Sequence, residues 1–185
     1  MDAARTIEKR FTYADYCTWP DDERWELIDG VAYAMSAPAE VHQRLLGELF
    51  GQLWTFFKGK TCQVYVAPFD VRLNAESGDN SVVQPDILVV CDKKKLENGK
   101  AVIGVPDFVI EILSPSNPQH DSVTKFNLYQ EAGVREYWIV DPENKTVFAH
   151  TLHGNRYFTR AYHNKGTVPV EIFEGCEINL SDVFG

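Results

Sequence analysis

Three polar residues in the middle of the chain combine residue types and a spacing that could do chemistry. Asp86 lies within the apolar run 82–90. Glu111 lies within a second such run, 108–113, and both runs are rich in the β-branched residues typical of buried strands. A buried carboxylate without a partner is costly, so each acid requires a cation, hydrogen-bond donors or a metal ion. Lys125 follows in a segment whose pattern predicts a helix.

The spacing of the two acids predicts that they converge. Successive side chains of a strand point to opposite faces, so Gln84 and Asp86 share one face, as do Val109 and Glu111. If the two strands are neighbours, both carboxylates meet at one edge of a sheet. Adjacent carboxylates repel each other unless a cation lies between them. Oxygen ligands of this kind suit Mg²⁺ or Mn²⁺.

Lys125 has two interpretations. It shares a helix face with Asp121 and Tyr129, one turn to either side. A lysine beside a metal-bound water could orient that water or balance charge on a phosphate. Alternatively, a buried ion pair between Glu111 and Lys125 holds the strand to the helix. Spacing alone does not decide between these two interpretations, because structural ion pairs also perturb titration.

Two other residues are candidates for the same site. Glu26 lies in a strand of a predicted hairpin, where the pattern favours a solvated edge position. His42 falls in the first turn of a predicted long helix, where a histidine is more often a boundary or core residue. Near a pair of carboxylates, His42 could instead bind phosphate or accept a proton.

The composition limits the classes of function. The 27 acidic and 18 basic residues give a net charge of −9, which weighs against broad electrostatic binding of nucleic acid but leaves room for a local basic groove. The four cysteines form no CxxC motif, so reduced thiols in a cytoplasmic protein are expected. No apolar run approaches the roughly 18 residues that a membrane span requires, so we expect a soluble protein without membrane contact.

The order of predicted elements indicates one α/β or α+β domain, residues 1–185, with a mixed central sheet. A short helix capped by Thr12 and an Asp29-Gly30 hairpin precede a long helix that ends near Phe57. The later elements are strands at 63–73, 82–90 and 108–113, a helix capped by Ser116 or Asp121 that stops at Gly133, a strand at 137–140, and an antiparallel meander at 146–150, 156–161 and 168–172.

Several short motifs distributed along the chain carry a family resemblance. They are Trp25-Glu26-Leu27-Ile28-Asp29-Gly30, Met35-Ser36-Ala37-Pro38 with His42, Gln84-Pro85-Asp86-Ile87, Glu111-Ile112-Leu113-Ser114-Pro115-Ser116, Lys125 with Tyr129, and Gly133-Val134-Arg135-Glu136-Tyr137-Trp138-Ile139-Val140-Asp141-Pro142. Together they resemble the Uma-two family of restriction-endonuclease-like proteins, within the PD-(D/E)XK nuclease superfamily. The resemblance extends from about Glu26 to the C-terminal meander.

The resemblance implies a restriction-endonuclease-like core with a hairpin in front and a meander behind. It makes Asp86, Glu111 and the carbonyl of Ile112 the ligands of Mg²⁺ or Mn²⁺, and it makes Glu26 a second acid of the site. The superfamily pattern has a lysine two residues after the acid, where this chain has Leu113. Lys125, delivered by the following helix, is the expected substitute.

The function implied by this resemblance is metal-dependent endonucleolytic cleavage of DNA. Because duplex cleavage requires two such sites, a homodimer is expected, formed through the C-terminal meander or the strand of Trp138. One alternative is a catalytically inactive nuclease fold that serves as a nucleic-acid-binding or assembly module. Another is a metal-dependent hydrolase of a different phosphorylated substrate.

Overall fold

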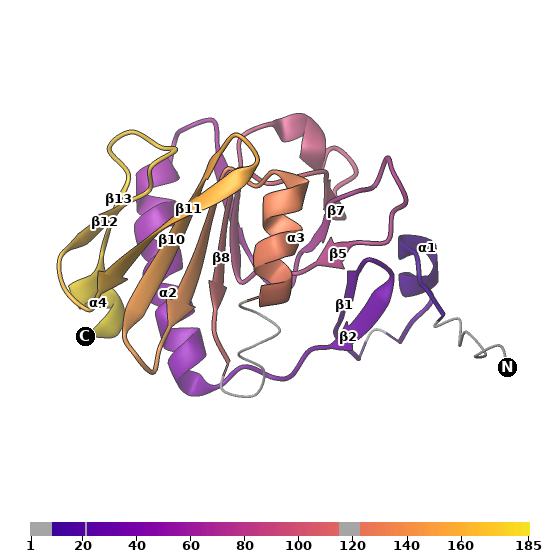
Figure 1. Ribbon diagram of the computed structural model, residues 1–185, viewed down its shortest axis with the longest axis horizontal. Coiled ribbons are helices and arrows are strands. Elements are labelled where there is room, and N and C mark those ends of the chain that lie inside the picture. The colour runs from indigo at the N-terminus through magenta and orange to yellow at the C-terminus, as the bar shows by residue number, and fades with distance from the viewer. Residues whose placement is uncertain (1–8, 21, 115–122) are drawn as a thin grey trace, which may run out of the picture.

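Two β-sheets form the centre of the molecule, and the computed structural model describes them within residues 9–20, 22–114 and 123–185. The larger sheet has the strand order β11-β10-β9-β8-β6-β3 and the smaller has the order β2-β1-β5-β4-β7. A two-stranded sheet of β12 and β13 lies near the C-terminus (Figure 1). The predicted α+β class with a mixed central sheet is confirmed, because β8 and β9 run parallel while the other pairs of the larger sheet are antiparallel.

The bounds of the elements are as follows. The helices are α1 (Tyr13–Tyr16), α2 (Glu40–Phe57), α3 (Lys125–Ala132) and α4 (Leu180–Phe184), with a 3₁₀ turn, η1 (Lys93–Leu96). The first eight strands are β1 (Trp25–Ile28), β2 (Val31–Ala34), β3 (Gln63–Val66), β4 (Asp70–Arg72), β5 (Val82–Val83), β6 (Ile87–Val90), β7 (Ala101–Ile103) and β8 (Phe108–Ile112). The last five are β9 (Glu136–Asp141), β10 (Thr146–His153), β11 (Arg156–His163), β12 (Thr167–Pro169) and β13 (Glu177–Asn179).

Two helix ends and one hairpin turn lie where the sequence predicts them. Thr12 caps α1 in a reciprocal arrangement with Asp15. The β1–β2 turn places Asp29 and Gly30 at φ values of 49° and 77°, the left-handed region that this two-residue hairpin requires. Gly133 ends α3 at a φ of 88°. The predicted caps of α3, Ser116 and Asp121, lie outside the described residues.

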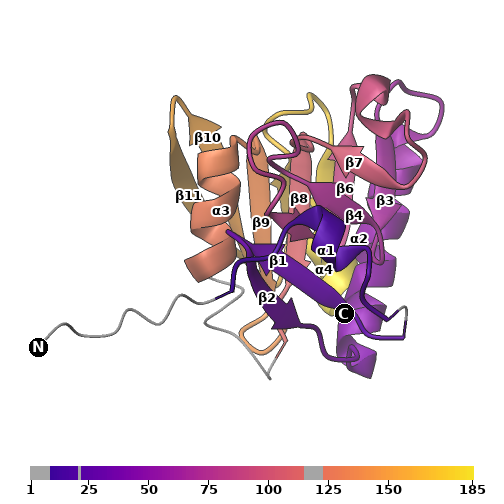
Figure 2. The same cartoon turned by 90° about the vertical axis from the view of Figure 1, so that its right-hand side faces the viewer.

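The larger sheet separates two apolar cores. One core packs α2, α4 and the β12–β13 sheet against Phe108, Ile110 and Ile112 of β8. The other packs α3 and the smaller sheet against Val109 and the opposite face. Figure 2 shows α2 and α3 on the two sides of the larger sheet. The alternation predicted for β8 is therefore confirmed, and Glu111 shares its face with Val109, toward α3.

Two predicted strands are each divided in the structure. The segment 63–73 forms β3 and β4, which belong to different sheets and are separated by a cis Ala67–Pro68 peptide. The segment 82–90 forms β5 and β6, again in different sheets, with Pro85 between them. Proline has no backbone N–H for a ladder, so the chain leaves one sheet there and enters the other. Asp86 lies in this break and not within a strand.

Three other features of the structure differ from what the sequence led us to expect. The segment 168–172 does not continue the meander, because β12 pairs with β13 instead of β11. The strand β7 and the helix α4 were not predicted at all. Cys62 and Cys91, expected to be reduced, form a disulfide with an S–S distance of 2.09 Å, whereas Cys17 and Cys176 are free. The β3–β6 register, in which Gln63 faces Val90, brings the two cysteines together although 29 positions separate them.

Candidate functional site

A cleft of about 130 Å³ contains all the residues predicted for the site. Its walls come from the β1–β2 hairpin, the start of α2, the β5–β6 break, the end of β8 and the start of α3. The predicted residues that line it are Glu26, His42, Asp86, Glu111, Ile112 and Lys125. They come from five parts of the chain that pack at one end of the larger sheet.

Asp86 lies opposite Glu111 across two antiparallel strands. Ile87 of β6 pairs with Ile110 of β8 in an antiparallel register. Asp86, which precedes Ile87, therefore lies opposite Glu111, which follows Ile110. Asp86 Oδ2 accepts a hydrogen bond from the Ile112 backbone N–H at 2.8 Å. The predicted convergence of the two acids is thus present, although a strand break provides it in place of strand alternation.

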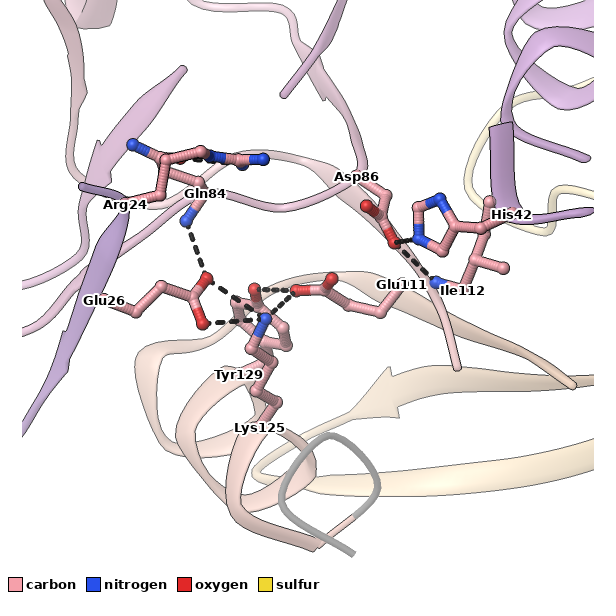
Figure 3. A network of polar contacts seen from close by, with 9 residues as sticks. All are labelled: Arg24, Glu26, His42, Gln84, Asp86, Glu111, Ile112, Lys125 and Tyr129. Atoms are coloured by element: carbon pink, nitrogen blue, oxygen red, sulfur yellow. Dashed lines mark hydrogen bonds and ion pairs between the residues drawn. The ribbon is translucent and has the colours of Figure 1, made fainter. Parts of the chain in front are cut away.

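Glu111 forms the centre of a buried network (Figure 3). Its Oε1 accepts hydrogen bonds from Lys125 Nζ at 2.9 Å and from the Tyr129 hydroxyl at 2.7 Å. Lys125 and Tyr129 lie four residues apart on α3, so one helix face supplies both donors. From the sequence, Tyr129 is placed on that face by its spacing and is included in the family motif with Lys125, but it has no assigned role.

Glu26 is buried, with 3% of its surface exposed, and the expectation of a solvated edge residue is wrong. Lys125 Nζ lies 3.1 Å from Glu26 Oε1 and 3.0 Å from Oε2. The same ammonium also contacts Glu111. The Gln84 backbone N–H donates to Glu26 Oε1 at 2.8 Å. Strand β1 pairs with β5, and the Gln84 N–H that binds Glu26 follows β5 directly.

His42 reaches the site from α2, on the opposite side of the sheet from Lys125. Its Nε2 lies 3.1 Å from Asp86 Oδ2, and its side chain is 12% exposed. Its Nδ1 is buried and has no hydrogen-bond partner among the described residues. Figure 3 shows His42 beside Asp86 and Lys125 beside Glu111, so the two acids are contacted from different elements.

The electrostatics of the cleft favour a proton or a cation at Glu111. Burial raises the pKa of Glu111 from its usual 4.5 to about 8. The Lys125 ammonium opposes this rise, whereas the negative charges of Asp86 and Glu26 add to it. The pKa of Tyr129 is raised far above 10, first by burial and then by Glu111, so the hydroxyl keeps its proton and acts as a donor.

The donor set fits a hard divalent cation held by few protein ligands. Among the described residues, Asp86 Oδ1 and Glu111 Oε2 accept no hydrogen bond, so each acid has one carboxylate oxygen available. Ile112 lines the cleft next to Glu111. No group of three or more His, Cys, Asp or Glu side chains within the described ranges could hold a metal. A cation here would therefore need water or substrate oxygens to complete its shell, which is usual for Mg²⁺.

Leu113 occupies the position where the superfamily pattern has a lysine. Its side chain packs, half-buried, on the core beside α3, and its backbone N–H donates to the Val140 carbonyl at 2.9 Å. Lys125 instead brings an ammonium to Glu111 from the helix. Arg24, which also lines the cleft, was not identified as a site residue from the sequence, because no local pattern separates it from other hairpin residues.

The fold itself is shared with a solved structure. A protein of Anabaena variabilis described as a "putative nuclease belonging to DUF820" superposes with a TM-score of 0.76 at 20% sequence identity. The alignment covers 94% of this chain and 97% of that one. The two proteins thus share an α+β fold with mixed sheets flanked by helices.

The sequence places the chain within a particular family of that class. Residues 13–181 match the model of the Uma2 family, described as "Putative restriction endonuclease". The chain belongs to the Uma2 family. An uncharacterized protein of Synechocystis is 28% identical over 117 residues, which are 62% of this chain. That match spans 60% of the relative's length.

One predicted absence concerns membranes. Within the part of the chain that the structure describes, no helix is both long enough and apolar enough to cross a lipid bilayer.

Proposed function

We propose that this protein is a metal-dependent endonuclease that hydrolyses DNA phosphodiester bonds. The observation that carries the proposal is the facing pair of Asp86 and Glu111, with Lys125 2.9 Å from the latter, in a chain of a restriction endonuclease family. Each acid offers an oxygen to a cation, and the cleft is open to a substrate. The family supports nuclease chemistry, and the metal and the substrate are our inference.

Asp86, Glu111 and the Ile112 carbonyl would hold Mg²⁺ or Mn²⁺. The bound ion would lower the pKa of an attacking water and offset the charge of the phosphate. His42 would fix the orientation of Asp86 through Nε2.

Lys125 would orient the attacking water. Glu26 and Tyr129 support this role, because Glu26 holds the ammonium from a second side and Tyr129 binds the same Glu111 oxygen as Lys125. Lys125 would act there as a hydrogen-bond donor and a positive charge, with Glu26 and Glu111 on either side of it.

Cleavage of supercoiled plasmid in Mg²⁺ or Mn²⁺ tests the proposal. We expect wild type to nick or linearise the plasmid and Asp86→Ala and Glu111→Ala to lose at least about 100-fold in rate, the order for removing a polar group that acts directly. Glu143→Ala, at an exposed acid in the β9–β10 turn, should cleave like wild type. Equal cleavage by all four proteins would show that the activity does not come from this site.

A second candidate function is a nuclease fold without catalysis that binds nucleic acid or assembles with other proteins. The observation in its favour is that Lys125 and Glu111 already form a buried ion pair, which could serve a structural role alone. A wild-type protein that binds DNA but leaves plasmid intact in both metals would favour this candidate.

A further inference from the structure

Arg24 lies on the wall of the cleft and has no part in the mechanism above. It precedes β1 by one residue, and its side chain is half-buried. Its Nε and Nη2 donate to the Oε1 of Gln84 at 3.1 and 2.9 Å. Gln84 is itself buried, 8% exposed, and lies in the β5–β6 break two residues before Asp86. Figure 3 shows Arg24 and Gln84 together on the Glu26 side of the network.

The far end of the Gln84 side chain fixes the direction of this contact. Gln84 Nε2 donates to Asp70 Oδ1 at 2.9 Å and to the Tyr16 hydroxyl at 3.2 Å. The Tyr16 hydroxyl donates in turn to Asp70 Oδ1 at 3.0 Å. Because the amide nitrogen is committed to these acceptors, the amide oxygen must face Arg24. The guanidinium is therefore held in one orientation by a buried, neutral side chain.

The charge of Arg24 is not neutralised by this contact. Within the described residues Arg24 forms no ion pair, whereas Arg72, Arg135 and Arg160 each lie against a carboxylate. A guanidinium has five N–H donors, and the two that bind Gln84 leave three for a ligand. An oriented cation with free donors beside a cleft is suited to an oxyanion.

The other cation of the cleft is already engaged. Lys125 lies between Glu26 and Glu111, both buried acids, and is 3% exposed. A phosphate that enters a cleft with three carboxylates therefore needs a positive charge from elsewhere. Arg24 lines the same cleft and carries that charge.

We propose that Arg24 binds a non-bridging oxygen of a DNA backbone phosphate in the cleft, with Gln84 as the residue that positions it. This inference rests on the proposed function, because it takes DNA as the ligand. It concerns the binding of DNA and not its cleavage, so this inference and the proposed function can be refuted separately.

The test is binding of a short fluorescein-labelled duplex oligonucleotide, measured by anisotropy over a range of salt concentrations, with Ca²⁺ in place of Mg²⁺ to prevent turnover. One lost phosphate contact should lower the slope of log affinity against log salt by about 0.9. We expect Arg24→Gln to show this decrease together with weaker binding. Arg135→Gln is the matched control, because it removes an exposed arginine that pairs with Asp107. It should retain both the wild-type slope and the wild-type affinity.

Arg24→Lys tests the orientation and covers the case in which Arg24→Gln does not fold. Lysine keeps the charge but cannot bind Gln84 and a phosphate with one planar group. We therefore expect weaker binding with an unchanged slope. The inference is overturned if wild type does not bind the oligonucleotide, or if Arg24→Gln has the affinity and salt slope of wild type. It is also overturned if Arg135→Gln loses as much salt slope as Arg24→Gln, or if Arg24→Lys binds as tightly as wild type. Arg24-dependent binding by a wild type that cuts no plasmid would refute the proposed function alone.

Discussion

At the scale of single residues, the centre of the site is a lysine shared by two buried acids. Lys125 contacts Glu26 and Glu111, so the three groups together carry one net negative charge when all are ionised. Burial in such a cluster favours uptake of a proton or a cation, which agrees in direction with the raised pKa of Glu111. The arrangement that stabilises the fold would therefore also favour the metal ion that we propose for the cleft.

We predict that Lys125→Met destabilises the protein by about 3–5 kcal/mol, because the two acids lose their buried counter-charge. For a chain of this size the melting temperature should fall by on the order of 10 °C. Calorimetry measures this decrease, with Lys100→Met, at an exposed lysine, as the control that should shift little. Plasmid cleavage below the melting temperature should also be lost.

A Lys125→Met protein with an unchanged melting temperature would contradict the stabilising role of this ion network. Lost cleavage in a variant that retains folding and metal binding would then assign Lys125 a purely catalytic role.

Sequence patterns identified the acids of the site better than they identified the acids' surroundings. Asp86 and Glu111 were visible because carboxylates interrupt apolar runs. Glu26 was expected to be exposed because a four-residue hairpin strand shows which residues alternate but not which face becomes covered. Its partner Lys125 lies 99 positions away, and that contact arises only from packing of α3 on the sheets.

At the scale of elements, the break between β5 and β6 positions the site. Pro85 ends one strand, and the next residues pass to the other sheet, which delivers Gln84 to the hairpin and Asp86 to the end of β8. A continuous apolar run gives no sign of a change of sheet. Helices α2 and α3 were predictable from their own periodicity, and they supply His42 and Lys125.

A second feature at this scale is the aromatic cluster between α3 and the larger sheet. His150 of β10 is 5% exposed and packs against Phe126, Tyr137 and Tyr157. Its Nδ1 contacts the Thr159 hydroxyl, and its buried Nε2 has no hydrogen-bond partner among the described residues. Burial lowers the pKa of His150 from 6.5 to about 4, so the folded protein holds this ring neutral.

We predict that this ring makes the fold sensitive to acid. Between pH 6.5 and 4 the unfolded chain binds a proton at His150 and the folded chain does not, so stability is complete above pH 6.5 and decreases as the pH falls through this window. The loss is bounded by about 3 kcal/mol. His150→Phe should lower the acid sensitivity of the melting temperature, and His153→Phe, at an exposed histidine of the same strand, should not. Parallel pH profiles for wild type and His150→Phe would contradict this prediction.

At the scale of the whole molecule, the proposed cleavage of both strands of a duplex would require two clefts. We predict a homodimer, with a mass in light scattering of about twice 21.0 kDa. The edge strand β11, with Phe158 63% exposed, belongs to the meander predicted to form the interface. Phe158→Asp should then shift the protein toward the monomer. A wild-type protein that stays monomeric at all concentrations would contradict the prediction.

The central claim is that Asp86 and Glu111 together hold a divalent cation. Anomalous diffraction from crystals soaked in Mn²⁺ tests it most directly, because the anomalous signal shows where the metal is bound. We predict a peak between the two carboxylates, next to the Ile112 carbonyl, in wild type and no peak in Asp86→Ala. A wild-type crystal with no manganese in the cleft, and with Glu111 still bound only by Lys125 and Tyr129, would contradict the claim.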